Sequence, residues 1–129
     1  MSIRQATVGD LDAISPLFDA YRVFYEERSD LDAAQAFLEE NLLHERSSVF
    51  LFEENGHVVG FTQLYPAVCS VAMKPFYVLY DLYVVPEARA HGIGTALLRH
   101  AHTRARAQGA FRLGLGTAHR NTTTHPIYA

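Results

Sequence analysis

Hydrophobic residues recur at helical spacing in some segments and at strand spacing in others, and these segments alternate along the chain. Such alternation predicts a mixed α/β domain. Ser2–Ala6 has the pattern of a short strand, and the helix after it carries an apolar stripe formed by Leu11, Ile14, Leu17, Phe18 and Tyr21. This helix has two alternative starts: Ser15 and Pro16 form its N-cap and first residue, or it begins near Val8 and kinks at Pro16. We favour the second, because the stripe already includes residues before Ser15.

The same spacing predicts two further helices. One runs from about Asp30 to Arg46, with Ser29 or Asp30 as its N-cap. The other is Thr95–Gln108, which ends at Gly109 as helices commonly do.

Strand patterns occupy most of the remaining chain. Val49–Glu54 and Val58–Tyr65 are separated by Asn55-Gly56, a strong signal for a tight hairpin turn. Pro66–Pro75 has the composition of a loop. Phe76–Val85 is rich in aromatic and β-branched residues and predicts a central strand buried on both faces. Phe111–Thr117 predicts a further strand, and a short polar segment follows it.

Composition narrows the class of protein. The chain has 129 residues, of which 49% are hydrophobic and 19% charged, which suits one folded domain. No apolar run is long enough to cross a bilayer, and the N-terminus lacks the pattern of a signal peptide, so we expect a cytoplasmic protein. A net charge of −3 disfavours a nucleic-acid partner. The single cysteine, Cys69, excludes an internal disulfide, and the spacing of the histidines predicts no metal site.

The segment from Leu82 to Leu98 carries the clearest chemical signal. A buried strand runs into a glycine-containing turn that opens a helix, where unpaired N–H groups favour anions. Gly92 and Gly94 lack the Cβ atoms that would block a phosphate, and Arg89 adds positive charge. The segment has neither the third glycine of a Rossmann motif nor the lysine of a Walker A loop. A plain strand–turn–helix connection is the alternative interpretation.

Four patterns in this sequence resemble the GNAT superfamily of acyl-CoA N-acyltransferases. Residues 89–94 match R/Q-x-x-G-x-G/A, after a D-L-Y-V-x-P strand and before a T-A-L-L helix. Arg4 with Asp10 resembles the opening R-x-A-T-x-x-D, and Gly56–Tyr65 resembles the G-x-x-V-G-F hairpin. Asn121 and Tyr128 have the spacing of the family's N-x-x-A-x-x-L-Y helix.

The resemblance implies an α/β fold with a central, mostly antiparallel sheet, helices on both faces and a splayed parallel strand pair at the cofactor site. It implies acetyl-CoA as cosubstrate and no metal. The implied pantetheine contacts are the backbone of Leu82, Tyr83 and Val84, together with Asn121. The implied pyrophosphate contacts are Arg89 and the backbone N–H groups of Ala90, His91, Gly92, Ile93, Gly94 and Thr95. Tyr128 would donate a proton to the departing thiolate.

The general base is less clear from the residues. Some relatives carry glutamate where this chain has Tyr80, and Asp81 is the nearest carboxylate. Asp81 is a candidate base, with a buried structural carboxylate as the alternative. On a regular strand Tyr80 and Asp81 would point to opposite faces. Tyr65 and Tyr80 are candidate walls of the substrate pocket, or core residues.

The end of the chain departs from the family pattern. Relatives usually continue beyond the position of Tyr128, so we expect residues 1–129 to form a single GNAT-like domain that lacks the usual C-terminal strands. An unpaired sheet edge would then favour a homodimer. Pro126 is unfavourable inside the helix that Tyr128 would need.

The leading hypothesis is an N-acetyltransferase that moves the acetyl group of acetyl-CoA to a primary amine of a small molecule, polyamine-like or amino-acid-like, or of a peptide. We expect no membrane partner. Acidic residues between the first two helices could favour a cationic amine, although a solvated loop explains them equally well. One alternative is a non-catalytic acyl-CoA-binding module; another is an interaction domain with an exposed sheet edge.

Overall fold

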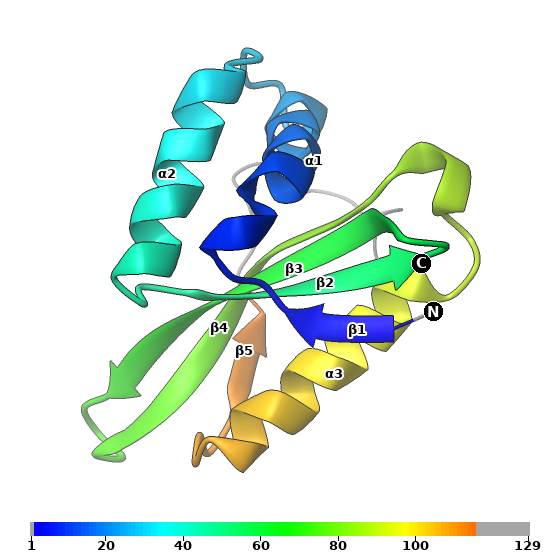
Figure 1. Cartoon of the computed structure of the whole chain (residues 1–129). Coiled ribbons are helices and arrows are strands. Elements are labelled where there is room, and N and C mark those ends of the chain that lie inside the picture. The colour runs from blue at the N-terminus through cyan, green and yellow to red at the C-terminus, as the bar shows by residue number, and fades with distance from the viewer. Residues whose placement is uncertain (1, 116–129) are drawn as a thin grey trace.

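The computed structural model describes residues 2–115, and Figure 1 shows their arrangement. Helices and strands follow one another in the mixed order that the hydrophobic pattern predicts. In chain order the elements are β1 (Ser2–Gln5), the short 3₁₀ helix η1 (Val8–Asp10), α1 (Leu11–Phe24), α2 (Leu31–Leu43), β2 (Ser48–Glu54), β3 (His57–Cys69), β4 (Lys74–Val84), η2 (Pro86–Ala88), α3 (Ile93–Ala107) and β5 (Leu113–Leu115).

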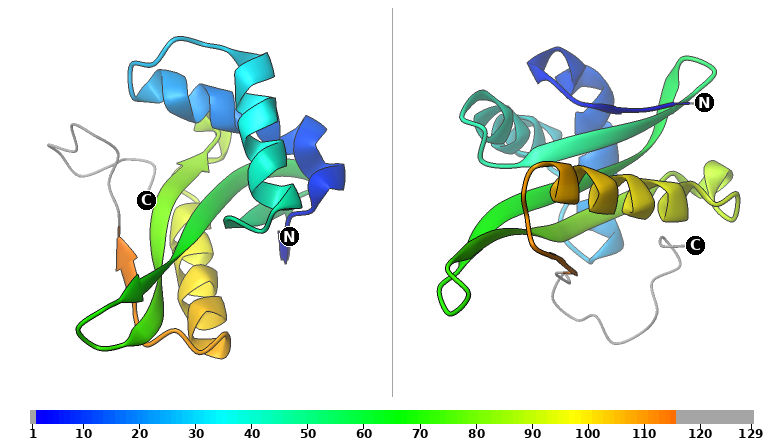
Figure 2. Two further views of the ribbon diagram at one scale, coloured as in Figure 1. Left: turned by 90° about the vertical axis from the view of Figure 1, so that its left-hand side faces the viewer. Right: turned by 90° about the horizontal axis from the view of Figure 1, so that it is seen from below.

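The strands of the described residues form one sheet in the order β1-β2-β3-β4-β5. Neighbouring strands are antiparallel except β4 and β5, which are parallel. Helices α1 and α2 cover one face of the sheet and α3 covers the other (Figures 1 and 2). The predicted fold class is therefore confirmed, including the parallel pair.

Two hydrophobic cores lie on the two faces of the sheet. The first joins α1 and α2 to the sheet through residues such as Ile14, Leu38 and Phe61. The second joins α3 to the sheet and includes Leu82 and Leu97. Strand β4 contributes to both cores, as predicted for a central strand.

The helix starts follow the capping residues. Helix α1 passes through Pro16 and is preceded by η1, so the alternative start at Ser15 and Pro16 is wrong. Thr7 caps η1 and forms a capping box with Asp10. Asp30 is the N-cap of α2, where its carboxylate accepts a hydrogen bond from the Ala33 amide at 3.1 Å.

The first hairpin has the turn that its sequence predicts. Asn55 and Gly56 both have positive φ, at 54° and 79°, as a type I′ turn requires. The loop predicted over Pro66–Pro75 is wrong, because β3 continues to Cys69 and β4 begins at Lys74.

The prolines of this second hairpin are accommodated by the shape of the sheet. The pairing of β2 with β3 ends at Leu64, so the rest of β3 pairs with β4 alone. A strand that is unpaired on one side tolerates a residue without an N–H group. Pro66 therefore pairs with Tyr77 without interrupting a ladder on its other side.

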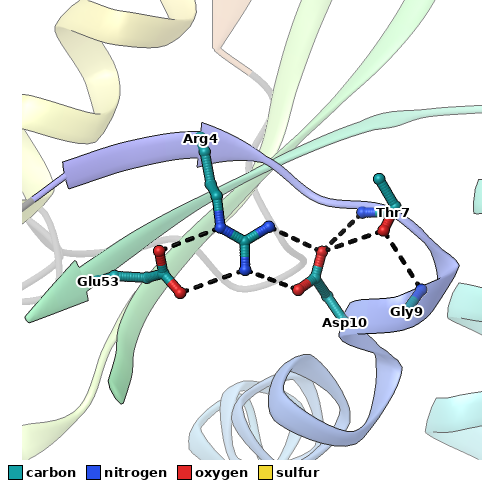
Figure 3. Close-up of polar contacts among 5 residues, drawn as sticks. All are labelled: Arg4, Thr7, Gly9, Asp10 and Glu53. Atoms are coloured by element: carbon teal, nitrogen blue, oxygen red, sulfur yellow. Dashed lines mark hydrogen bonds and ion pairs between the residues drawn. The ribbon is translucent and has the colours of Figure 1, made fainter. Parts of the chain in front are cut away.

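An ion-pair cluster ties the N-terminal strand to the rest of the fold (Figure 3). The Arg4 guanidinium donates to both Asp10 carboxylate oxygens, at 2.7 and 3.0 Å, and to both Glu53 oxygens, at 3.0 and 3.2 Å. The Asp10 carboxylate also accepts the Thr7 amide at 2.8 Å. The R-x-A-T-x-x-D pattern is thus a structural clamp that joins β1, η1 and β2.

Candidate active site

Strand β4 contains a β-bulge at Tyr80. Gln63 pairs with Asp81 and Leu64 pairs with Leu79, so Tyr80 has no partner on β3. An extra residue of this kind interrupts the alternation of side chains along a strand. Tyr80 and Asp81 both line one pocket on the face covered by α1 and α2. The expectation that they point to opposite faces is therefore wrong.

Side chains replace the ladder hydrogen bonds that the bulge disrupts. The Tyr21 hydroxyl of α1 lies 3.3 Å from the Tyr80 carbonyl and shares its one proton between that carbonyl and the Asp81 carboxylate. The Thr62 hydroxyl of β3 donates to the Asp81 carbonyl at 2.8 Å. Because both carbonyls of the bulge are satisfied, the irregular backbone is held in a defined position.

The Asp81 carboxylate is buried at the base of the pocket, with its residue 6% exposed. Its Oδ2 atom accepts a hydrogen bond from Gln63 Nε2 at 2.7 Å. Burial raises the pKa of Asp81 to about 6, against the opposing effect of hydrogen bonds from Gln63 and Tyr21. A carboxyl group with this pKa is ionised at neutral pH and can still exchange a proton there.

A buried amide network positions the Gln63 side chain. Its Oε1 atom accepts Ser47 Oγ at 2.6 Å and Asn41 Nδ2 at 3.1 Å. Asn41 Nδ2 also donates to the Tyr65 hydroxyl at 3.2 Å. Burial, followed by the nearby Asp81 charge, raises the pKa of Tyr65 to about 12, so its hydroxyl is neutral. The network fixes the amide so that its N–H faces Asp81.

The pocket above Asp81 has a volume of about 470 Å³, within the range of small-molecule sites. It is lined by Phe18, Phe37, Tyr65, Val78, Tyr80 and Asp81. A second hollow shares three of these residues and extends to Tyr21, Arg22, Tyr25 and Glu27. A larger hollow of about 710 Å³ near the end of α2 contains none of the predicted site residues. The structure thus supports Tyr65 and Tyr80 as pocket walls.

Next to this pocket, the outer edge of β4 has no partner strand among residues 2–115. Within residues 2–115 the parallel pairing of β4 with β5 ends at Leu79 and Leu115. The Val85 amide donates to Val59 of β3 at 2.9 Å. Since backbone groups alternate in direction along a strand, those of Tyr83 also face β3, whereas those of Leu82 and Val84 face the open edge. Of the three predicted pantetheine contacts, Leu82 therefore presents both its amide and its carbonyl to this edge, and Val84 presents its amide, because its carbonyl accepts a hydrogen bond from Arg89.

The turn after β4 forms a cradle at the start of α3. Ala90 and Gly92 adopt the left-handed conformation, with φ of 66° and 78°. Gly92 is the N-cap of α3, so the first amides of this helix lack partners within it. A Cβ atom at Gly92 would meet nothing within 4 Å, so the space beside this residue is open. The donors and the room fit a pyrophosphate group.

The predicted residues of the cradle differ in exposure and in which of their groups can contact a ligand. His91 and Thr95 are exposed at the helix start, whereas Ile93 is buried in the core under α3 and offers its backbone alone. Arg89 Nε donates to the Val84 carbonyl at 2.7 Å. Its guanidinium lies over the rings of Phe24 and Tyr83, at 5.7 and 5.2 Å from their centres. Arg89 therefore fastens the turn to α1 while its charge stays beside the edge of β4.

Two predicted site residues, Asn121 and Tyr128, lie outside the described residues. Sequence reasoning missed the network residues Asn41, Ser47 and Gln63 and the pocket residues Phe18 and Phe37. Gln63 did carry a signal, because it is a polar residue within an apolar strand and is completely buried. No helix in the described part of the chain is long and apolar enough to cross a membrane.

Comparisons with known proteins agree with this geometry. The model of the Acetyltransferase (GNAT) family matches residues 12–129. An uncharacterised N-acetyltransferase of Bacillus subtilis, YhfO, is 48% identical over 99% of this chain and 86% of its own length. The crystal structure of a probable acetyltransferase is 38% identical, with a TM-score of 0.86, over 93% of this chain and 82% of the other.

A further crystal structure, of an aminoglycoside N-acetyltransferase in complex with CoA, is 21% identical to this chain, with a TM-score of 0.76. The match covers 94% of this chain and 79% of the other chain, and the two proteins share the fold. The chain belongs to the GNAT family of acetyltransferases, so the family and the enzyme class predicted from the sequence are confirmed. The predicted homodimer and cytoplasmic location stay predictions.

Proposed function

We propose that this protein moves the acetyl group of acetyl-CoA to a small primary amine that binds in the pocket above Asp81. The β-bulge in β4 is the observation that carries this proposal. It brings Tyr80 to the same face as the pocket carboxylate of Asp81, and the backbone of the next residue, Leu82, faces away from β3 toward the outer edge of the strand. The acceptor pocket and the candidate cofactor edge therefore meet at adjacent residues.

The chain offers a continuous surface for the cofactor. The outward backbone groups of Leu82 and the amide of Val84 would pair with the pantetheine arm. The amides of residues 90–95 would hold the pyrophosphate at the start of α3. The solved relative with CoA supports the choice of cofactor. The family resemblance adds Asn121 as a further contact.

Acetyl-CoA, when bound, supplies an acetyl thioester whose C–S bond breaks as the amine nitrogen forms the new C–N bond. Asp81 binds the ammonium form of the acceptor and takes one proton from it, which frees the nitrogen lone pair for attack. The outward amide of Leu82 donates a hydrogen bond to the thioester carbonyl oxygen. The family resemblance assigns Tyr128 as the proton donor to the leaving thiolate. The nitrogen loses its second proton as the C–S bond breaks, and this proton replaces the one given to the thiolate. The products are the N-acetyl amine and the free thiol, with one proton left on Asp81.

Acetyl-CoA binding to a Gly92→Val variant tests the cradle. The new side chain would occupy the open space beside residue 92 at the start of α3, and we expect acetyl-CoA to bind at least about tenfold more weakly in calorimetry. Gly109→Val is a matched control, because Gly109 also has positive φ, at 85°, and an equally open Cβ position. The control variant carries comparable backbone strain and should bind acetyl-CoA like the unmodified protein.

Thiol release with a panel of primary amines then separates the enzyme from the alternative acyl-CoA-binding module. Release of free thiol that depends on an amine supports acetyl transfer. Tight acetyl-CoA binding without thiol release from any amine would favour the binding module. Equal loss of binding in Gly92→Val and Gly109→Val would contradict the proposed cradle.

A further inference from the structure

The acceptor pocket combines one buried carboxylate with aromatic walls. Phe18 and Phe37 stack with ring centres 5.7 Å apart, and Tyr65 and Tyr80 meet edge to face at 6.0 Å. Phe37 and Tyr80 remain 47% and 46% exposed. Large aromatic surfaces left open around a hollow are typical of a ligand site.

Among residues 2–115, Asp81 is the one ionised group that lines this pocket. Tyr65 does not add a second negative charge, because its pKa of about 12 keeps it neutral. At the mouth, Glu27 pairs with Arg22, with 3.7 Å between Oε1 and Nη2. Arg22 also lies 4.0 Å from Asp19, so its charge is shared by two carboxylates outside the pocket. Inside the pocket, Asp81 is the anchor for a cation.

We infer, on the basis of the acetyl transfer proposed above, that the acceptor is an apolar primary amine with a single ammonium group, such as an alkylamine or arylalkylamine. The ammonium group would pair with Asp81, and the hydrocarbon body would pack against Phe18, Phe37 and Tyr80. A second ammonium group on the same body would lose water against aromatic walls and find no anionic partner. Polyamines and polycationic sugars are therefore poor acceptors.

Hexylamine and hexamethylenediamine form a matched pair of probes, because they differ only in the second ammonium group. We expect kcat/KM for hexylamine to exceed that for hexamethylenediamine by at least about tenfold. Phenethylamine should behave like hexylamine, and spermidine like the diamine. Calorimetric binding of the same amines to the CoA-bound protein should follow the same order.

A charge introduced on the pocket wall tests the assignment further. Phe37→Glu replaces an aromatic wall with a second carboxylate, so we expect the preference to move toward hexamethylenediamine by about tenfold. Leu31→Glu is the matched control, since Leu31 lies on the same helix, is also 47% exposed and does not line the pocket. The control should keep the preference of the unmodified protein.

The outcomes separate this inference from the proposed function. Efficient acetylation of the diamine or spermidine, at or above the rate for hexylamine, would overturn the inference while acetyl transfer stands. Absence of thiol release from every amine would overturn the proposed function. In that event, calorimetric binding still tests the inference. It would be overturned if hexylamine bound no more tightly than hexamethylenediamine, or if Phe37→Glu left the preference between the two amines unchanged.

Discussion

The residues around Asp81 shift its pKa in opposite directions. Removal from water disfavours its charge, and hydrogen bonds from Gln63 and Tyr21 favour it. The balance leaves a carboxylate that is charged at neutral pH but weakly solvated, which is the state required to bind an ammonium group and take its proton. The aspartate of the D-L-Y-V strand is visible in the sequence, whereas its pKa depends on partners from α1 and β3.

The pKa of Asp81 predicts the pH dependence of acetyl transfer. With a value of about 6, kcat/KM for hexylamine should rise through pH 6 and then level off, because Asp81 must be ionised to take the proton. Among the described residues, the other ionisable groups around this carboxylate are the tyrosines Tyr21, Tyr25, Tyr65 and Tyr80, with the Arg22–Glu27 pair at the mouth. Asp81→Asn should remove the rise near pH 6 in a steady-state rate profile.

Stability gives an independent check on the same residue. The folded-state pKa of Asp81 lies above its ordinary 3.8, so the free energy of unfolding should fall as pH rises from about 4 to about 6. The change in the free energy of unfolding caused by Asp81→Asn should therefore be more favourable above pH 6 than at pH 4. A variant that loses stability equally at both pH values would contradict the buried charge.

At the scale of elements, the bulge in β4 and the close packing of α3 create the site. The pattern of amino acids along the chain predicted the central strand, the Asn55-Gly56 turn and the glycine turn before α3, because each of these features depends on residues close together in the sequence. The bulge at Tyr80 depends on the register between β3 and β4, which hydrophobic pattern does not specify. The composition of Pro66–Pro75 predicts a loop and does not show the extension of the second hairpin, because prolines are tolerated where a strand has no partner on one side.

Gly60 sets the distance between β3 and α3. A Cβ atom at this position would lie 3.2 Å from the Tyr83 carbonyl oxygen and 3.3 Å from side-chain atoms of Ile93 and Leu97. Gly60→Val should therefore lower the free energy of unfolding by about 1–3 kcal/mol in denaturant titration, as overpacking does. Gly114→Val is the control, since its Cβ would lie 3.9 Å from the nearest atom. Equal stability of the two variants would show that α3 can move away without cost.

At the scale of the whole molecule, the two cores are built on one sheet and β4 belongs to both. The site lies where this shared strand loses its parallel neighbour within the described residues. Sequence motifs predicted the family, the fold and the cradle because those features are continuous in the chain. The amide network that joins α2 to Asp81 combines residues from α2, β3 and β4, and their proximity follows only from the tertiary fold.

The Arg4 clamp holds the first strand to this sheet, and its strength should depend on pH. Hydrogen bonds from Arg4 hold the pKa of Asp10 below its ordinary value, with a further contribution from the Thr7 amide. A carboxylate with a lowered folded-state pKa stabilises the protein above its unfolded pKa, and this stabilisation is lost as pH falls through the folded-state pKa. The Arg4 side chain is 43% exposed, so solvent screening limits the expected contribution to about 1 kcal/mol.

Arg4→Met should therefore lower the free energy of unfolding by about 1 kcal/mol at pH 7, and by less at pH 3, where Asp10 begins to take up a proton. Arg99→Met provides the comparison, because Arg99 is an exposed arginine of α3 with no ion pair to any described residue. Denaturant titrations of both variants at the two pH values give the measurement. A loss of stability at pH 3 as large as that at pH 7 would contradict a stabilising role for the ion pair with Asp10, because this pair weakens when the carboxylate is protonated.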